Sequence, residues 1–393
     1  MKTPLSICFV SLYAYSLLNR ATRYVFGGSE VRAWLFGQAL ARLDDYDVSF
    51  VVYDHGQDQV EVFDGLKVFP HSYYKGSAVG RAGLSGLIGR GRERVEHSFL
   101  KQGLRDRKER VYRQVGAGVY CSVGLTRISA EVARFCVEAD RRFVFLFGQN
   151  EEFSLDWPET RQYLGTILKN AGLVITQTDD QAGWLQERFG RASLTIKNPI
   201  DLNGAAEPSG RPPAERFALW VGKSKALKGP EKLLELARLV PELGFVMVLN
   251  KGDDDIHGRV LAERPENVEI IEYLPLAEME KLFGRALLFV NTSPQEGFPN
   301  TFLQAGKHHL PILSLEVDPD RFISQHRCGL SAGGDMDRLA AGFKEVLASE
   351  ELRAEYGHNA FCYVLENHRL EDRAAQFRQA LASVAGLPAG EGG

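Results

Sequence analysis

A polar loop between two apolar runs is the part of this 393-residue chain best suited to chemistry. The run 286–290 predicts a buried parallel strand, and a loop with Glu296 and Gly297 leads from it to a helix that starts near Asn300. In an open α/β sheet, ligands bind beyond the carboxyl ends of the strands, where helix N-termini offer free N–H groups. A carboxylate beside a glycine, which lets the backbone approach a ligand, suits sugar or polyol binding.

A second polar loop holds two cations. Gly222 and Lys223 follow a predicted strand over 217–221, and Lys228 precedes a helix that starts at Gly229-Pro230. Glycine permits a tight turn, and two lysines could converge on a diphosphate at the helix N-terminus. Taken alone, such a loop is more often merely solvated, so phosphate binding becomes the stronger interpretation only together with Glu296.

A third loop contains Gly27 and Gly28 and precedes an amphipathic helix predicted from about Ser29 to Leu43. From the residues alone, the loop could be a simple flexible connection with Ser29 as the helix N-cap.

Composition and charge narrow the class of protein. The chain is 44% hydrophobic and 25% charged, as in ordinary soluble globular proteins, and a net charge of −4 gives no case for nucleic-acid binding. Five widely spaced cysteines without a C-x-x-C pair indicate buried, reduced thiols of a cytoplasmic protein. The apolar stretch 5–12 is expected to be the first buried strand rather than a targeting segment, and no run is long enough to cross a bilayer.

The order of elements predicts an α/β protein. Strand-like runs alternate with helical patterns along the whole chain, as expected for parallel sheets with crossover helices. Asp179 or Asp180 is expected to cap the helix that runs through Trp184 to Phe189. A stretch rich in turn formers, 197–213, separates two halves with the same pattern. Each half is therefore expected to be a doubly wound domain, with the ligand site in the cleft between them.

The Lys223–Lys228 loop and the Glu296 loop together resemble the donor-binding signature of family 4 glycosyltransferases (glycosyl transferases group 1), which retain the anomeric configuration and have the GT-B fold. The resemblance implies two Rossmann-like domains facing a central cleft. Residues 1–198 would form the acceptor-binding domain and 199–365 the donor-binding domain. A C-terminal helix at about 366–385 would cross back onto the first domain.

The resemblance also implies roles for individual residues. Lys223 and Lys228 would stabilise the departing diphosphate, and Glu296 would bind hydroxyl groups of the donor sugar. Asn150 is assigned a hydrogen-bonding role toward the donor sugar or the acceptor. The remaining donor-binding residues would be Gly27, Gly28, Gly222, Leu274, Gly297, Phe298, Pro299, Asn300, Thr301 and Gln304.

Two residues depart from the family pattern. Lys223 stands where arginine is usual, which keeps the charge but loses bidentate geometry. Gln304 stands where the family has a glutamate that binds the ribose hydroxyls. An amide can still accept a hydrogen bond, but the loss of charge assistance is expected to cost about 1–2 kcal/mol of donor binding.

The implied activity is transfer of a sugar from a nucleotide-diphosphate sugar to a saccharide or lipid-linked acceptor, with no cofactor and no metal. Asp253 to Asp255 are accordingly expected to be a solvated loop rather than a metal site, and His308 and His309 to be packed against the sheet. The basic segment 81–113 is either a surface insertion or a patch for peripheral contact with the inner face of a membrane. A non-catalytic nucleotide-sugar-binding scaffold subunit and a sugar-nucleotide epimerase remain as alternatives.

Overall fold

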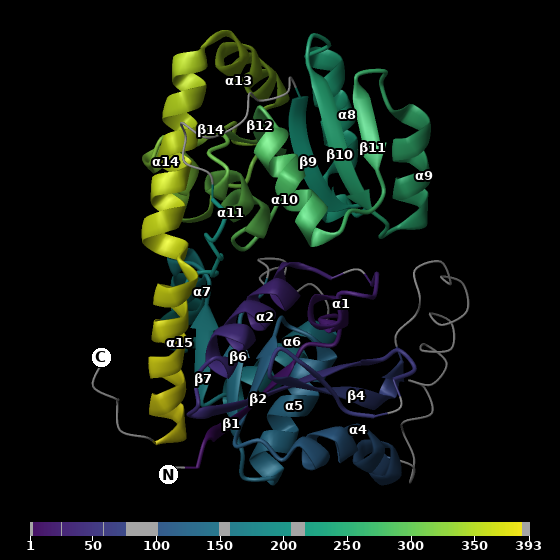
Figure 1. Cartoon of the computed structure of the whole chain (residues 1–393), viewed down its shortest axis with the longest axis vertical. Helices are drawn as coiled ribbons and strands as arrows, with labels where there is room; N and C mark the ends of the chain where they lie inside the picture. The colour runs from purple at the N-terminus through teal and green to yellow at the C-terminus, as the bar shows by residue number, and fades with distance from the viewer. Residues whose placement is uncertain are drawn as a thin grey trace.

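A computed structural model of the chain describes residues 3–24, 26–57, 59–75, 101–148, 158–205 and 217–386. Asn150 and the part of the basic segment at 81–100 lie outside these residues. The described residues form two domains, each built on one twisted sheet with helices on both faces (Figure 1).

The first sheet is parallel except for its edge strand β3. Antiparallel pairing joins β3 to β4, and every other neighbouring pair is parallel. In sheet order the strands are β3 (Glu61–Phe63), β4 (Leu66–Lys75), β2 (Tyr46–Asp54), β1 (Leu5–Val10), β5 (Val119–Val123), β6 (Arg142–Leu146), β7 (Leu173–Thr176) and β8 (Leu194–Thr195).

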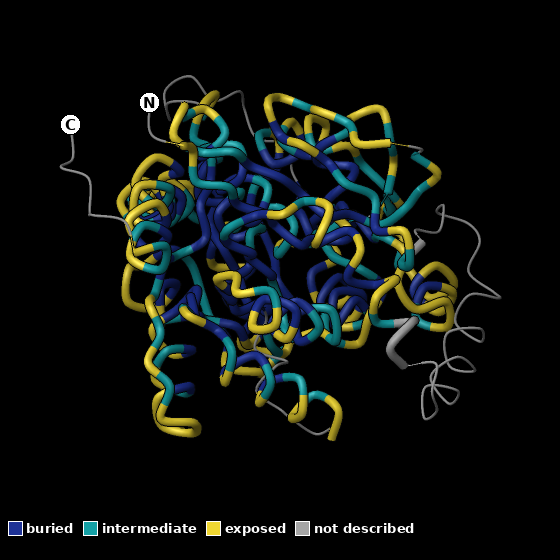
Figure 2. The backbone as a smooth tube through the Cα atoms, turned by 90° about the horizontal axis from the view of Figure 1, so that it is seen from below, coloured by how far each residue is buried: buried dark blue, intermediate teal, exposed yellow. Residues whose placement is uncertain are grey.

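Helices cover both faces of this sheet because its strands are apolar on both sides. Ile7 and Phe9 of β1 pack on one face, and Cys8 and Val10 pack on the other. These four residues are buried. Figure 2 shows in dark blue the buried backbone that fills the interior of the molecule. The helices of this part of the chain are α1 (Tyr15–Leu18), α2 (Gly28–Ala41), α4 (Lys101–Val115), α5 (Arg127–Glu138), α6 (Pro158–Asn170) and α7 (Asp179–Phe189).

The second sheet is entirely parallel among its described strands. In sheet order these are β11 (Val268–Ile271), β10 (Gly244–Asn250), β9 (Phe217–Lys223), β12 (Leu288–Asn291), β13 (Ile312–Ser314) and β14 (Gly329–Ser331). In both sheets the strand order reverses beside the first strand, at β1/β5 and at β9/β12. A doubly wound sheet opens a crevice for ligands at this reversal.

Helices also cover both faces of the second sheet. Phe289 and Phe302 belong to one buried cluster, and Trp220 and Phe343 belong to the other. The elements of this part are η3 (Ala226–Lys228), α8 (Pro230–Leu239), α9 (Asp254–Glu263), α10 (Leu276–Arg285), α11 (Asn300–Lys307), η4 (Pro319–Arg321), α12 (Phe322–Gln325), α13 (Met336–Ala348) and α14 (Glu350–His368).

The chain passes between the two domains twice, and the two crossings lie side by side. The Ile200 N–H donates to the His368 carbonyl at 2.8 Å, and the Leu370 N–H donates to the Ile200 carbonyl at 3.0 Å. Helix α14 packs against α11 of the second domain, and α15 (Leu370–Ala385) then continues along the first domain (Figure 1). On α15, Phe377 is fully buried and stacks on Phe36 of α2 with ring centroids 4.5 Å apart.

Several local expectations need correction. Thr178, not Asp179 or Asp180, caps α7, because its extended backbone lets its hydroxyl accept from the Gln181 N–H at 3.2 Å. The acidic triplet is exposed, as expected, but it begins helix α9 rather than forming a loop: Asp253 is the N-cap and accepts from the Ile256 N–H at 3.0 Å. The strand expected at 286–290 is β12, which starts two residues later because Ala286 ends α10.

Candidate functional site

The two polar loops predicted to bind phosphate and sugar meet beyond the carboxyl ends of β9 and β12. Lys223 is the last residue of β9, Lys228 ends the short helix η3, and Glu296 lies in the loop after β12. The lysine side chain of Lys228 forms an ion pair with Glu296 Oε1. The structure therefore brings this predicted cation and this predicted carboxylate into direct contact at the strand-order reversal.

Glu296 is held by one of its two oxygens. Ser293 Oγ donates to Oε1 at 2.8 Å, the same oxygen that pairs with Lys228. Within the residues that the structure describes, Glu296 Oε2 has no hydrogen-bond partner, and the side chain is 7% exposed. A buried carboxylate normally uses all its oxygens, so Oε2 is available to accept from a ligand.

Lys223 is a half-buried cation that contacts no acid in the part of the chain that the structure describes. Among the described residues, its ammonium group has neither a hydrogen-bond acceptor nor an ion-pair partner. Burial lowers its pKa, the Glu30 carboxylate of the first domain opposes this, and Lys225 and Lys228 lower the pKa further. A charged group left in this state favours an anion in the space beside it.

A tight backbone contact fixes Lys228 at its position. Gly229 has φ +55°, and a Cβ atom there would lie 2.3 Å from the Thr292 carbonyl oxygen. Thr292 Oγ1 donates to the Gly229 carbonyl at 2.8 Å and accepts from Trp220 Nε1 at 2.9 Å. The loop after β9 is thereby fastened to the loop after β12. Gly222 is also restricted, because a Cβ atom there would meet the Trp220 ring at 2.5 Å.

The Gly27-Gly28 pair begins helix α2 rather than forming a free loop. Gly27 is the N-cap, and Ser29 lies inside the helix, so Ser29 is not the cap. The Glu30 carboxylate accepts from the Gly27 N–H at 2.7 Å. The first-turn N–H groups of a helix have no intrahelical acceptor, and those of α2 are presented on the side of the first domain that contacts the second. That contact is direct, because Asn300 Nδ2 donates to the Gly28 carbonyl at 3.0 Å.

The remaining residues of the Glu296 loop contact the first domain. A Cβ atom on Gly297 would lie 2.7 Å from the Gly148 carbonyl oxygen. The Phe298 N–H donates to Gln177 Oε1 at 3.1 Å. That N–H was expected to meet a sugar or phosphate, and in this structure a first-domain amide occupies it instead. Pro299 is the N-cap of α11, with φ −63°.

The last predicted donor-binding residues lie on either side of this contact. Thr301 and Gln304 are half-buried on α11, and within the described chain no residue bonds the Gln304 side chain. Leu274 lies between β11 and α10 and packs against the core of the second domain. Among the residues that the structure describes, no hydrogen bond or ion pair joins Leu274 to Glu296.

Three residues absent from the sequence expectations are important here, two at the interface between the domains and one within the first domain. Gln177 follows β7, Asn198 lies in the first crossing between the domains, and both are buried. Arg32 of α2 is buried and donates to the carbonyls of Phe147 at 2.9 Å and Ile196 at 2.9 Å. Burial lowers the Arg32 pKa to about 9. Isolated amides and an arginine on a helix carry no motif, so the sequence held no signal that identified them.

Aromatic rings gather at the carboxyl ends of β1 and β2 in the first domain. Tyr13 is 55% exposed and lies edge-on to Tyr53, with centroids 4.8 Å apart. His55 stacks on Tyr24 at 3.8 Å and on Tyr15 at 5.2 Å. These rings present an aromatic surface at the strand ends where a doubly wound domain binds ligands.

Part of the described basic segment is paired within the first domain. On α4, Arg105 and Arg113 pair with Glu109, and Lys108 pairs with Glu131 at 2.9 Å. Lys108 and Glu109 are buried. Arg107 and Arg110 of the same helix are exposed, so contact of this segment with a membrane stays a prediction. Within the described residues, no helix has the length and apolar character needed to span a membrane.

His308 and His309, which were expected to pack against the sheet, each contact a particular residue. His308 is the C-cap of α11 and its Nε2 lies 2.9 Å from Glu280 Oε2, while the buried His309 stacks on Phe361 of α14. Across the described chain, no three His, Cys, Asp or Glu residues form a group that could hold a metal ion.

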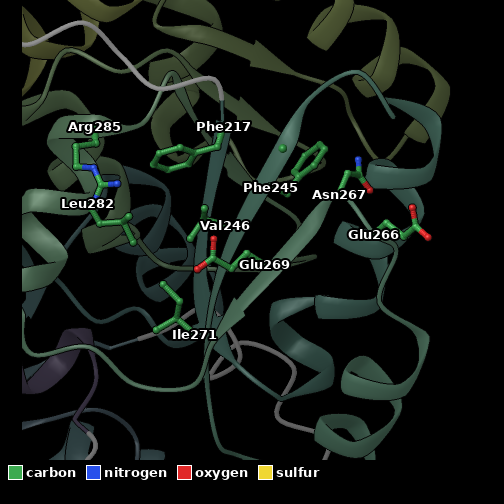
Figure 3. A pocket seen from close by; sticks show the side chains of 10 residues that line it. Phe217, Phe245, Val246, Glu266, Asn267, Glu269, Ile271, Leu282 and Arg285 are labelled. Carbon is green, nitrogen blue, oxygen red and sulfur yellow. The ribbon is translucent and has the colours of Figure 1, made fainter.

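A cavity of about 380 Å³ lies in the second domain, away from the site (Figure 3). Phe217, Phe245 and Asn267 line it near the starts of β9, β10 and β11. Ligands of doubly wound sheets bind at the opposite strand ends. Position at the strand-order reversal, rather than cavity size, therefore identifies the Lys223–Lys228–Glu296 cluster as the candidate site.

The chain was next compared with known proteins. Residues 205–361 match the family model described as "Glycosyl transferases group 1". This match spans most of the second domain, including all three residues of the cluster. Assignment to family 4 within this group stays a prediction.

Solved structures similar over the whole chain settle the architecture. The sucrose-phosphate synthase of Thermosynechococcus elongatus has a TM-score of 0.73 at 16% identity, with 97% of this chain and 99% of that chain covered. Anabaena HepE in complex with UDP and glucose has a TM-score of 0.69 at 14% identity, with 96% and 100% covered. The fold is GT-B. At these identities the likeness establishes the fold alone.

One curated relative matches part of the chain. It is the GtfA subunit of the UDP-N-acetylglucosamine–peptide N-acetylglucosaminyltransferase of Streptococcus pneumoniae, 23% identical over 239 residues. The match covers 56% of this chain and 44% of the relative, so it spans less than half of that protein's length.

Proposed function

We propose that this protein is a retaining glycosyltransferase that moves a sugar from a nucleotide-diphosphate donor to a saccharide or lipid-linked glycan, without a metal. One observation carries the proposal. At the strand-order reversal of the second domain, the half-buried Lys223 lies in the same cluster as the Lys228–Glu296 ion pair, and within the described ranges neither the Lys223 ammonium nor Glu296 Oε2 has a partner. This combination suits a ligand that is anionic at one end and rich in hydroxyl groups at the other.

The two lysines would act on the leaving group. As the bond between the sugar and the diphosphate breaks, negative charge grows on the phosphate oxygens. Preorganised cations in a half-buried site stabilise that charge, and a single such group typically accounts for about 10²–10³ in rate. Positioning of donor and acceptor would supply much of the remainder.

Donor binding would rearrange the Lys228–Glu296 pair. A diphosphate beside Lys228 competes with the carboxylate for the ammonium group, which frees Oε1 as well as Oε2 to accept from sugar hydroxyls. Ser293 would keep the carboxylate in place during this exchange, because it bonds Glu296 independently of Lys228. The ion pair thus holds both residues ready in the absence of donor.

The first domain would bind the acceptor. Sugar rings pack their C–H faces against aromatic rings, and the exposed Tyr13 with Tyr53 offers such a surface beyond the ends of β1 and β2. We expect Tyr13→Ala to raise the KM for a saccharide acceptor several-fold and to leave the KM for the donor unchanged. A rise in the donor KM alone would contradict this assignment.

The names of similar proteins suggest which sugar donors to test first. Uridine diphosphate or a UDP-sugar appears in the descriptions of HepE, of the Staphylococcus aureus enzyme TarM and of the GtfA subunit. UDP-glucose and UDP-N-acetylglucosamine are therefore the first donors to try, followed by sugars on other bases.

The direct test is thermal stabilisation of the purified protein by a panel of nucleoside diphosphates and nucleotide sugars, with and without magnesium. Stabilisation by one base in the absence of magnesium is the expected result. Transfer to mixed saccharide acceptors is then measured, and the anomeric configuration of the product distinguishes retention from inversion or epimerisation. Glu296→Ala should abolish turnover; full turnover in that variant would refute the assignment.

Gln304 favours a second candidate, a non-catalytic subunit that binds nucleotide sugars. This residue replaces a charged acceptor with an amide, and none of the described residues bonds its side chain. In that case the wild-type protein would bind a nucleoside diphosphate but show no transfer. Gln304→Glu should tighten nucleotide binding under either candidate, so only turnover separates them.

A further inference from the structure

A network of side-chain amides joins the Glu296 loop to the first domain. Its members are the buried Gln177, Gln181 and Asn198, the half-buried Asn300 and the carbonyl groups that they bond. Gln177 is at its centre and is 5% exposed. Gln177 Nε2 donates to the carbonyls of Phe147 at 2.9 Å and of Gly148, at the end of β6. Gln177 Oε1 accepts from the Phe298 N–H at 3.1 Å.

Asn198 extends the network through the crossing between the domains. Its Nδ2 lies within hydrogen-bond distance of Gln177 Oε1, the Phe298 carbonyl and Asn300 Oδ1, at 3.1, 3.0 and 3.0 Å. The Asn198 carbonyl accepts from His368 Nδ1 at 2.7 Å, so the second crossing fixes the backbone of the first. Asn198 therefore contacts both domains and both crossings.

Asn300 closes the connection on the other side of the loop. Its Nδ2 donates to the Gly28 carbonyl at the start of α2, at 3.0 Å. Gly297 completes the contact, because only a residue without a Cβ atom can lie so near the Gly148 carbonyl and the Gln177 amide. Residues 297, 298 and 300 of the Glu296 loop are thus held by first-domain or crossing residues.

We propose that Gln177 and Asn198 are positioning residues that order the Glu296 loop only while the two domains are closed on each other. Rotation of the second domain away from the first would break the bonds to Phe298 and Asn300 together, since all of them cross the interface. The loop would then lose the contacts that set its backbone. With the function proposed above, this arrangement would make the donor site complete only in the closed protein.

The chemistry of the network explains why amides are used. Gln177 donates on one side and accepts on the other, and neither a carboxylate nor an apolar residue can do both. A buried polar group that loses its partner carries a desolvation penalty, so partial opening is disfavoured and the contact tends to form or break as a unit.

Hydrogen exchange of the ligand-free protein tests the proposal without any assumption about activity. In Gln177→Leu, the Phe298 N–H loses its acceptor, and we expect exchange in the loop 296–301 to accelerate by about tenfold, in line with the loss of one buried hydrogen bond. Asn198→Asp conserves shape and removes the donor, so it should accelerate exchange in the same segment. It also serves as the second variant should Gln177→Leu fold poorly.

Asn267→Leu is the matched control. Asn267 is also an amide with several carbonyl partners, since its Nδ2 donates to Ala237 at 2.9 Å and to Leu243 at 3.0 Å, but it lies in the second domain far from the interface. This variant should lose stability and leave exchange in 296–301 unchanged. Equal acceleration in control and test variants, or unchanged exchange in both Gln177→Leu and Asn198→Asp, would overturn the proposal.

Kinetic measurements then test the role of the amide network separately from the proposed glycosyltransferase activity. If the wild type turns over UDP-glucose or another donor, Gln177→Leu should raise the KM for that donor about tenfold and leave the acceptor KM unchanged. If the wild type binds no nucleoside diphosphate, the proposed function fails, while the exchange result still decides whether the network orders the loop.

Discussion

At the scale of single residues, the ion pair between Lys228 and Glu296 should stabilise the folded protein, and both residues should also bind the donor. Glu296 is almost completely buried and Lys228 is 20% exposed. Removing one member of such a pair leaves a charge without its partner, and the exposed fraction of Lys228 moderates the cost.

A double-mutant cycle with Lys228→Met and Glu296→Gln should therefore give a coupling energy of about 1–2 kcal/mol in the free energy of unfolding, measured by chemical denaturation without ligand. A coupling energy near zero would mean that solvent screens the pair. In transfer assays, each single variant should lower kcat/KM by about 10²-fold or more.

Unlike the Lys228–Glu296 pair, Lys223 is expected to lower the stability of the folded protein while it favours ligand binding. Burial lowers its pKa, so its charged form is less favourable in the folded than in the unfolded protein. The penalty is fully present below the folded pKa and disappears as the pH rises from there through the ordinary lysine range.

Lys223→Met should consequently raise the melting temperature at pH 7 and weaken the stabilisation that a nucleoside diphosphate provides. Lys225→Met is the control, because Lys225 is exposed and on the same loop. Equal loss of nucleotide binding in both variants would indicate that the overall charge of the loop matters more than the position of Lys223.

At the scale of elements, the turn between η3 and α8 depends on a glycine for two separate reasons. Gly229 has a left-handed backbone, and a Cβ atom would collide with the Thr292 carbonyl. Gly333 has φ +68° as well but open space around it.

Gly229→Ala should thus destabilise the protein by more than Gly333→Ala, for which only the backbone penalty of about 1–2 kcal/mol applies. Denaturant titration of both variants gives the comparison. Nucleotide binding should weaken only in Gly229→Ala, because displacement of Thr292 shifts the loop that carries Glu296. Equal costs would show that the loops can separate without strain.

The elements were largely predictable from the sequence, and their ends were less so. Apolar runs such as those of β9 and β10 can be recognised because a strand buried on both faces has no polar alternation. The N-cap of α7 was wrong because Thr178, Asp179 and Asp180 are all good capping residues, and only the backbone conformation selects among them.

The interface contacts could not be predicted for a different reason. Gln177 and Asn300 are more than a hundred residues apart, and their meeting at Asn198 depends on how two folded domains pack. The expectation that the Phe298 N–H is free for a ligand failed on this point. A motif specifies its own loop, but it cannot specify what the neighbouring domain offers to that loop.

At the scale of the whole molecule, a buried histidine lies where the chain passes between the two domains. The stability of the protein at low pH therefore depends on this interface. His368 is fully buried, its Nδ1 bonds the Asn198 carbonyl, and burial lowers its pKa to about 3. Because the unfolded side chain takes up a proton near pH 6.5, stability is complete above that pH and falls as the pH drops toward 3.

The free energy of unfolding should accordingly be about 2–3 kcal/mol lower at pH 4.5 than at pH 7 from this group alone. His368→Gln should reduce this pH dependence, although it also lowers stability at pH 7. His71 is buried in the first domain, and burial lowers its pKa to about 4. It makes its own contribution to the loss of stability at low pH, and His71→Phe would remove that contribution. An unchanged acid slope in His368→Gln would contradict the assignment.

The return of α15 to the first domain has a consequence for the order in which the protein is made. Phe377 fills the space between Phe9 and Phe36, two residues near the start of the chain. A ribosome releases the rest of the first domain long before it reaches this residue, and the second domain is synthesised in between. The first domain therefore completes this part of its core only after the second domain has been synthesised, and until then the apolar surface that α15 covers is exposed.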